Sequence, residues 1–409
     1  MNLLISIFCF LFIFSLTDFI YPNQKRIHDQ LYRLAFSITY ILFTIKYYYG
    51  ADIFSYVNLY DTIEDPMTLI TAHSYKLSFK SYFEPGFLLF YSVCKYIGLS
   101  YWMMTAVIST IYFYSLNLFL NKISEKKIFA LFLIVVLDFN LMFAAFRQCL
   151  AVSFFMLTIL AYINKKYFKT IIFFLLILSM HKSAFFACIF FIIAVSLDSY
   201  KANRANYYLL TTCFFLFLFF SFSDIIYFFV NKLSLSGTTE ASIKHHLLLG
   251  QKIQSVFVLY FLGLFAFALY YKKSEDNTRE HRFLQWLSFI ALLLIVFLYQ
   301  NYYLLNRIRS YFIPVVVVFL FLLIKESSFI RKRKYILFQE LAFVAIYIFL
   351  STVIIRRSIE QNNLKSGIYD TSTVFSRLTR SEKDIRQEQL KKAEVFWKNE
   401  FKQNIKNKE

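Results

Sequence analysis

Runs of apolar residues, roughly 15 to 22 residues long, recur along nearly the whole chain and are separated by short polar connections. Segments of this length are what a helix needs to cross the hydrocarbon core of a bilayer. Only 4 Pro and 7 Gly occur among the 409 residues, so few runs are interrupted. The pattern predicts an all-α polytopic membrane protein with about 10–12 transmembrane helices.

Two of the apolar runs are shorter than a full crossing. One lies between about residues 84 and 97, before Gly98, and the other lies near residues 170–180. Half-length helices are tolerated in a membrane where protein or water surrounds them. We therefore expect one or two short or re-entrant segments, of the kind that often lines a cavity for a polar substrate.

Composition supports a membrane protein and argues against a nucleic-acid partner. Hydrophobic residues make up 59% of the chain, above the ~45–50% of soluble domains. The formal net charge of +19 would indicate nucleic acid in a soluble protein, but here the basic residues collect in short connections between apolar runs. All five cysteines lie in apolar runs without metal-ligand spacing, so neither a metal site nor a cofactor is predicted.

The basic connections predict the orientation of the chain, because positively charged connections stay on the cytoplasmic side. They lie near residues 25–33, 122–127, 165–169, 201–204, 272–282 and 325–334. The remaining connections are then predicted to face outward, and they are residues 50–83, 143–148, 180–184, 224–250 and 300–309.

The chain divides into two regions. Residues 1–355 are predicted to form the transmembrane domain, including the first apolar run, which lacks the basic start and cleavage site of a signal peptide. Residues 356–409 form a charged tail in which about residues 380–404 are predicted to be helical. This helix is either surface-lying or partner-binding, and the side of the membrane on which it lies stays open.

Charged residues inside apolar sequence are the first candidates for function, because a charge in the membrane costs several kcal/mol. Arg147, followed by Gln148, lies within the apolar run of residues 128–163, and His181 interrupts another apolar stretch. Both fall at predicted outward junctions. Snorkelling of the arginine and a satisfied interfacial histidine are the structural alternatives.

Further polar residues flank the outward connections. The first connection opens at Asp52 and Tyr56 and closes at Glu84. A turn role for Asp52 and a helix-capping role for Glu84 are the structural alternatives. A later connection supplies Arg307, Arg309 and, in the following apolar run, Tyr311.

These acids, arginines and the histidine are predicted to converge on one face of the membrane. Guanidinium groups match phosphate oxygens, and a carboxylate or histidine can take a proton from an attacking hydroxyl. An outward-facing phosphate in a membrane is most naturally a lipid-linked phosphate or pyrophosphate. The set therefore indicates glycosyl transfer from a lipid carrier, with the arginines stabilising the departing pyrophosphate in place of a metal.

The order of the polar motifs resembles the EpsG branch of Wzy-type polysaccharide polymerases over residues 1–355. The most specific part is the pair Arg147-Gln148-x-x-Ala151 and His181-x-Ser183-Ala184. The other matching elements are Gly50-x-Asp52-x-x-x-Tyr56, Glu84-x-Gly86, and Arg307 with Tyr311.

The resemblance implies a multi-pass enzyme of the bacterial inner or plasma membrane whose active site faces the periplasm or exterior. Such an enzyme joins undecaprenyl-pyrophosphate-linked oligosaccharide repeat units into O-antigen, capsule or exopolysaccharide. Membrane lipid, a flippase and a chain-length regulator are the further partners that it implies, and nucleic acid is not among them.

The resemblance supports the positions of the motif residues, and the chemistry of the candidate side chains suggests a role for each. Arg147 and Arg307 are expected to hold the pyrophosphate. Asp52, Glu84 or His181 is expected to orient or deprotonate the acceptor hydroxyl. The remaining expected substrate-binding residues are Gln148, Arg309, Tyr56 and Tyr311.

Other functions remain open from the residues alone. A polytopic glycosyltransferase with a polyprenyl-phosphate sugar donor also uses an acid in its first outward loop, which Asp52 fits. A flippase needs cations along the whole membrane depth, whereas here they gather at one face. A membrane acyltransferase has a different motif order, and a scaffold role does not explain Arg147 and His181.

Overall fold

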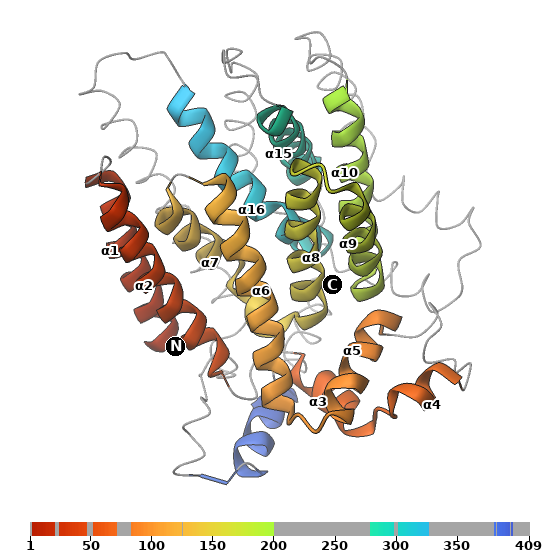
Figure 1. Cartoon of the computed structure of the whole chain (residues 1–409). Coiled ribbons are helices and arrows are strands. Elements are labelled where there is room, and N and C mark those ends of the chain that lie inside the picture. Colours follow the sequence, from red (N-terminus) through yellow and green to blue (C-terminus); the bar gives the residue numbers. More distant parts are fainter. Residues whose placement is uncertain are drawn as a thin grey trace, which may run out of the picture.

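The computed structural model of the protein describes residues 2–20, 24–46, 52–71, 83–124, 126–199, 279–297, 302–326 and most of 380–395. Within these ranges the chain forms α-helices joined by short connections, as the sequence predicted (Figure 1). The predicted connections at residues 201–204 and 224–250 lie outside the described residues, as does most of the charged tail.

The helices are named in chain order as α1 (Asn2–Ile20), α2 (Lys25–Thr44), α3 (Ile53–Thr62), α4 (Pro66–Thr71), α5 (Pro85–Tyr96), α6 (Tyr101–Ile123), α7 (Lys127–Ala144), α8 (Phe146–Ile163), α9 (Tyr167–Met180), α10 (Ala184–Ser199), α15 (Arg279–Phe297) and α16 (Tyr302–Glu326). A further helical segment, residues 383–392, is called the tail helix.

Two of the described helices, α6 and α8, are long and apolar enough to cross a membrane, with 23 and 18 residues. Several others are apolar but shorter, including α9 with 14 residues. This is consistent with a membrane protein. The predicted total of about 10–12 crossings depends partly on residues outside the described ranges and stays a prediction.

Successive long helices alternate in direction, so the connections gather at two ends of the bundle (Figure 1). At one end, the Asp18 carboxylate of α1 accepts hydrogen bonds of 3.0 Å from the backbone amides of Ile128 and Phe129 at the start of α7. We call this the basic end, because it holds the described basic clusters near residues 25–33, 122–127 and 165–169, the first of which lies in α2.

The opposite end, which we call the site end, holds the turns from α7 to α8 and from α9 to α10, together with α3, α4 and α5 (Figure 1). The Tyr60 hydroxyl donates to the Leu99 carbonyl at 2.6 Å. The Lys95 amine donates to the carbonyls of Asp61 and Ile63 at 2.8 and 2.9 Å. These bonds attach α3 to the end of α5, a helix of 12 residues that stays at this end. Whether α5 is re-entrant in a membrane stays a prediction.

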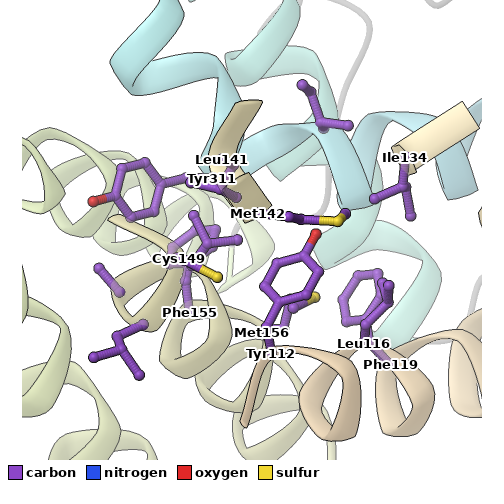
Figure 2. Packing of buried hydrophobic residues seen from close by; sticks show 14 of the residues in the cluster. Tyr112, Leu116, Phe119, Ile134, Leu141, Met142, Cys149, Phe155, Met156 and Tyr311 are labelled. Atoms are coloured by element: carbon purple, nitrogen blue, oxygen red, sulfur yellow. The ribbon is translucent and has the colours of Figure 1, made fainter. Parts of the chain in front are cut away.

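Side chains from α6, α7, α8 and α16 fill the centre of the bundle (Figure 2). Tyr112, Phe155 and Tyr311 are each at most 1% exposed. The rings of Phe155 and Tyr311 meet edge to face, with centroids 5.9 Å apart. Close packing of this kind is what holds helices together in lipid, where no hydrophobic force acts between them. It fixes α16 against α8 and brings the start of α16 to the site end.

The tail helix packs at the site end against α3. Ile385 is 1% exposed and Gln389, one turn later, is 4% exposed. Arg386 forms an ion pair with Asp61 of α3. The side of the tail helix that carries Ile385 and Gln389 is therefore covered by other parts of the chain. The predicted helical residues beyond 395 lie outside the described part of the chain.

Candidate active site

Glu84 lies at the centre of the polar residues of the site end, and its side chain is 2% exposed. Its Oε2 accepts a hydrogen bond from Arg147 Nη1 at 2.9 Å. Its Oε1 lies 3.1 Å from His181 Nδ1 and accepts from the backbone N–H of Lys182 at 2.9 Å. Pro85 begins α5, but the Glu84 side chain makes no capping hydrogen bond to that helix. Glu84 instead joins α5 to α8 and to the turn between α9 and α10.

Gly86 permits the close approach that this arrangement needs. A Cβ atom at this position would lie 2.4 Å from the Ser179 Oγ of α9 and 2.7 Å from its Cβ, closer than real contacts allow. Only glycine therefore lets the start of α5 reach α9 without displacement. This gives a physical reason for the spacing of Glu84-x-Gly86.

Arg147 is the second residue of α8, and its side chain is 12% exposed. Its guanidinium lies over the ring of Phe83, with Cζ 4.9 Å from the ring centroid, and it also hydrogen-bonds to Tyr56. The Tyr56 ring packs against Phe146 at a centroid distance of 5.0 Å. The cation–π contact and the ion pair with Glu84 together hold the guanidinium inside the polar cluster.

Asp52 supplies a second carboxylate. It precedes α3, but its side chain makes no capping hydrogen bond to that helix. Arg147 and Arg307 both lie close enough to attract it electrostatically. Burial raises the pKa of the Asp52 carboxyl, and the charges of the two arginines oppose this. A carboxyl with a raised pKa holds a proton more readily than an ordinary one, which suits a proton acceptor.

Glu84 and His181, which lie in connections between helices, are shifted differently. Burial raises the pKa of Glu84, but the His181 hydrogen bond and the Arg147 charge outweigh it and hold that pKa well below its usual range. Burial lowers the pKa of His181, opposed by its hydrogen bond to Glu84. Glu84 is therefore an anion that orients a neutral imidazole.

The start of α16 brings Arg307 and Tyr311 to the same region. The Gln148 side-chain amide donates to the backbone carbonyl of Arg307. The Ser183 Oγ lies 3.5 Å from the Tyr311 hydroxyl. Arg307 also acts electrostatically on His181. Gln148 thus contacts the backbone of α16, and its predicted role in binding substrate stays a prediction.

Arg309 is not brought to this group. Residues two positions apart on an α-helix differ by about 200° around its axis. Arg309 acts electrostatically on Asp138 of α7, and the Ser310 Oγ donates to Asp138 Oδ1 at 2.8 Å. The predicted role of Arg309 in binding substrate therefore stays a prediction, with its guanidinium associated with Asp138 rather than with Asp52.

Asp138 and Lys46 are buried charged residues that the sequence pattern had not singled out, each 4% exposed. The Lys46 amine donates to the Met142 carbonyl and lies 5.2 Å from the centroid of the Phe146 ring. The signal for Asp138 was available, because it is an isolated acid in the same apolar run as Arg147. Lys46 ends an apolar run, where a lysine is ordinary and carries no such signal.

The site contains cations and carboxylates but, among the residues that the structure describes, no cluster of three or more His, Cys, Asp or Glu side chains that could hold a metal ion. Metal-independent chemistry stays a prediction. Two guanidinium groups, those of Arg147 and Arg307, act electrostatically on one carboxyl, that of Asp52. Guanidinium groups can bind an anion, and a carboxylate can accept a proton.

Comparison with protein families identifies the class to which this site belongs. A family model described as the EpsG family matches residues 30–365, a range that includes every candidate site residue named above. The match covers more than half of the chain, and the protein belongs to the EpsG family of Wzy-like polysaccharide polymerases. The resemblance seen in the polar motifs is therefore confirmed. No curated protein and no solved structure matches the chain.

Proposed function

We propose that the protein polymerises undecaprenyl-pyrophosphate-linked oligosaccharide repeat units on the outer face of the bacterial inner or plasma membrane. The observation that carries this proposal is the contact of one carboxylate, Glu84, with both Arg147 and His181. It assembles the most specific motifs of the chain at the end opposite the basic connections. Membership of the EpsG family supports the reaction class, and the positive-inside rule supports the outward assignment of the site end.

Arg147 and Arg307 hold the pyrophosphate of the donor in this proposal. A guanidinium stays charged at any biological pH and presents five N–H donors, so the Nη1 contact of Arg147 with Glu84 is compatible with phosphate contacts. Glu84 and the Phe83 ring fix the orientation of Arg147 before substrate binds. Such preorganised cations stabilise negative charge as it develops on the leaving group.

The transfer step follows from this arrangement. A hydroxyl of the acceptor sugar attacks the anomeric carbon of the donor, and a new carbon–oxygen bond forms. The bond between that carbon and the pyrophosphate oxygen breaks, and its electron pair leaves with the lipid pyrophosphate. The hydroxyl proton passes to Asp52. Glu84 is a poor proton acceptor because its pKa is low, so we assign it the positioning of Arg147 and His181.

Replacing Arg147 in cells that otherwise lack the protein tests the proposal. Arg147→Ala should abolish long-chain polymer while protein level and single-unit surface glycan persist. Arg147→Lys should also be poor, because an ammonium cannot supply the bidentate fork. Arg33→Ala is the matched control, because Arg33 is an exposed arginine of α2 near the basic end. It should leave the electrophoretic ladder unchanged.

Two outcomes of that experiment would decide against the proposal. A ladder of normal length from Arg147→Ala would reject the assigned role of this arginine. A uniform loss of one sugar from every repeat unit would indicate instead a glycosyltransferase that adds a single residue.

The membrane face is tested separately by thiol labelling, in protoplasts that carry a variant lacking native cysteines. Met67→Cys places a thiol at an exposed position of α4, at the site end, where Met67 is 69% exposed. Lys165→Cys places one in an exposed connection at the basic end. A membrane-impermeant maleimide should label the first and not the second. The reverse result would place the site on the cytoplasmic face.

A further inference from the structure

α7 departs from regular helical geometry, and α16 lacks one backbone hydrogen bond, near the point where the two helices contact one another. In α7, Asp138 has φ −134° and ψ 28°, which is not helical. In α16, Pro314 has no N–H to donate to the carbonyl four residues earlier, which belongs to Ser310. Asp138 and Ser310 are joined by the 2.8 Å hydrogen bond and are each 4% exposed. An ionisable residue buried at such a place is a candidate for function.

The turn of α16 that begins at Arg307 is held at two points. Gln148 of α8 donates to the Arg307 carbonyl, and Asp138 of α7 accepts from the Ser310 hydroxyl three residues later. Because Pro314 has no N–H, one backbone hydrogen bond fewer joins this turn to the rest of α16. The orientation of the turn therefore depends more on these two side-chain contacts than it would in a helix with all its backbone hydrogen bonds.

The orientation of this turn decides where its two arginines lie. Arg307 acts on Asp52, whereas Arg309 acts on Asp138. A rotation of the turn by one residue, about 100°, would carry Arg307 away from Asp52. The separation of the two arginines is thus a consequence of how α16 is held.

We propose that Asp138 is a positioning residue of the polymerase: by accepting the Ser310 hydrogen bond it fixes the rotation of the start of α16 and so directs Arg307 to the site. This inference rests on the proposed role of Arg307 in holding pyrophosphate. Asp138 contacts α16 and acts on substrate through Arg307.

Paired variants separate the hydrogen bond from the charge of Asp138. Asp138→Asn keeps an oxygen that accepts from Ser310 and removes the charge beside Arg309, whereas Asp138→Leu removes both. Ser310→Ala removes the donor, and Ser310→Thr keeps it. With purified protein and lipid-linked repeat units, Asp138→Leu and Ser310→Ala should raise KM by about 10- to 100-fold, the effect of a misplaced binding group. Asp138→Asn and Ser310→Thr should stay near the wild-type KM.

The decisive measurement repeats the two disruptive variants in an Arg307→Ala background. If Asp138 acts through Arg307, neither Asp138→Leu nor Ser310→Ala should reduce activity per molecule any further. An additional loss there, an unchanged KM for both disruptive variants, or equal effects of Asp138→Asn and Asp138→Leu would overturn the inference. Ser310→Ala deletes a single oxygen, so it keeps the test usable if Asp138→Leu does not accumulate.

The result for Arg307→Ala alone shows which proposal fails. Full activity of Arg307→Ala would overturn the proposed role of Arg307, and the inference with it. Strong loss in Arg307→Ala combined with a wild-type KM in both disruptive variants would leave the proposed function in place and remove only the role of Asp138.

Discussion

Each end of the bundle holds a buried carboxylate beside a histidine. At the basic end, Asp18 is 4% exposed, its Oδ1 lies 2.9 Å from His28 Nδ1, and its Oδ2 accepts from two backbone amides of α7. At the site end, Glu84 is 2% exposed and meets His181, one backbone amide and Arg147. The residue types are nearly the same, and the partners differ.

The partners indicate what each carboxylate does. The first backbone amides of a helix have no acceptor within that helix, so Asp18 stabilises the start of α7 by capping it. Glu84 instead orients the side chains of Arg147 and His181, which can themselves contact a substrate. A buried acid–histidine contact is therefore insufficient to identify an active site. The group on the other carboxylate oxygen distinguishes the two ends.

The largest loss of polymerisation activity should come from Asp52→Asn, a variant of the site end. Loss of a general base lowers rates by about 10²- to 10⁴-fold. In the wild-type protein, the raised pKa of Asp52 should make the polymerisation rate fall as the pH drops through that pKa, because the base must be deprotonated. The rate is measured at saturating substrate in liposomes as a function of pH.

The basic end provides the control for this pH profile. In the wild-type protein, the rate should fall on the acidic side of the pH profile. His28→Gln should leave the pH of this fall unchanged, whereas Asp52→Asn should remove the fall together with most of the rate. If the rate of Asp52→Asn still falls at low pH in the same way, the titrating group belongs to another residue.

The second-largest effect should come from Glu84, which is compared with Asp18, the buried carboxylate of the basic end. Glu84→Gln leaves Arg147 without its buried counter-charge, and breaking such a pair costs about 3–5 kcal/mol. This free energy is a loss of folding stability. The Arg147 guanidinium also loses the contact that orients it, so we expect polymer per molecule to fall by about 100-fold, the effect of a misplaced group. Polymer is measured by electrophoresis and normalised to protein level.

Asp18→Asn is the matched variant at the basic end. It should lower the melting temperature, because a capping side chain contributes about 0.5–2 kcal/mol, and leave polymer per molecule close to wild type. Equal losses of specific activity in Asp18→Asn and Glu84→Gln would remove the distinction drawn between the two ends.

A smaller effect is expected from Gly86→Ala. The new Cβ would meet Ser179 Oγ at 2.4 Å, so α5 must shift and carry Glu84 with it. Overpacking should lower the free energy of unfolding by about 1–3 kcal/mol. The displacement of Glu84 should lower activity per molecule by about tenfold, less than removal of the carboxylate. Gly98→Ala is the control, because its Cβ would meet nothing within 4 Å although its φ is +80°. It should lower stability by about 1–2 kcal/mol with little effect on specific activity.

The smallest effect should come from the tail helix, which lies beyond the matched residues 30–365 of the family. Arg386 pairs with Asp61, and the two side chains are 35% and 47% exposed. Exposed ion pairs contribute about 0–1 kcal/mol, so Arg386→Ala should change the melting temperature slightly and leave the glycan ladder as it is. Shortened polymer in this variant would give the tail a direct part in the reaction.

The lengths of the apolar runs and the positions of the basic clusters predicted much of this arrangement. They predicted a helical bundle and separated the basic connections from the junctions that hold Arg147 and His181. The motif order also predicted the family. The sequence did not predict that Glu84 binds both of these residues, because a glutamate just before Pro85 is an ordinary helix-capping pattern and its actual partners come from distant helices.

Sequence alone predicted that the chain is helical and which junctions lie opposite the basic clusters, because hydrophobic run length and charge position are local properties. It did not predict α3, α4 or the start of α16, which are helical within the predicted connections 50–83 and 300–309. Only the tertiary structure decided which polar groups meet. Arg307 acts on Asp52, whereas Arg309 acts on Asp138. Asp18 accepts from backbone amides at the start of α7, whereas Glu84 accepts from the side chain of Arg147. These pairings depend on the rotation and close approach of packed helices, which side-chain contacts between distant segments set.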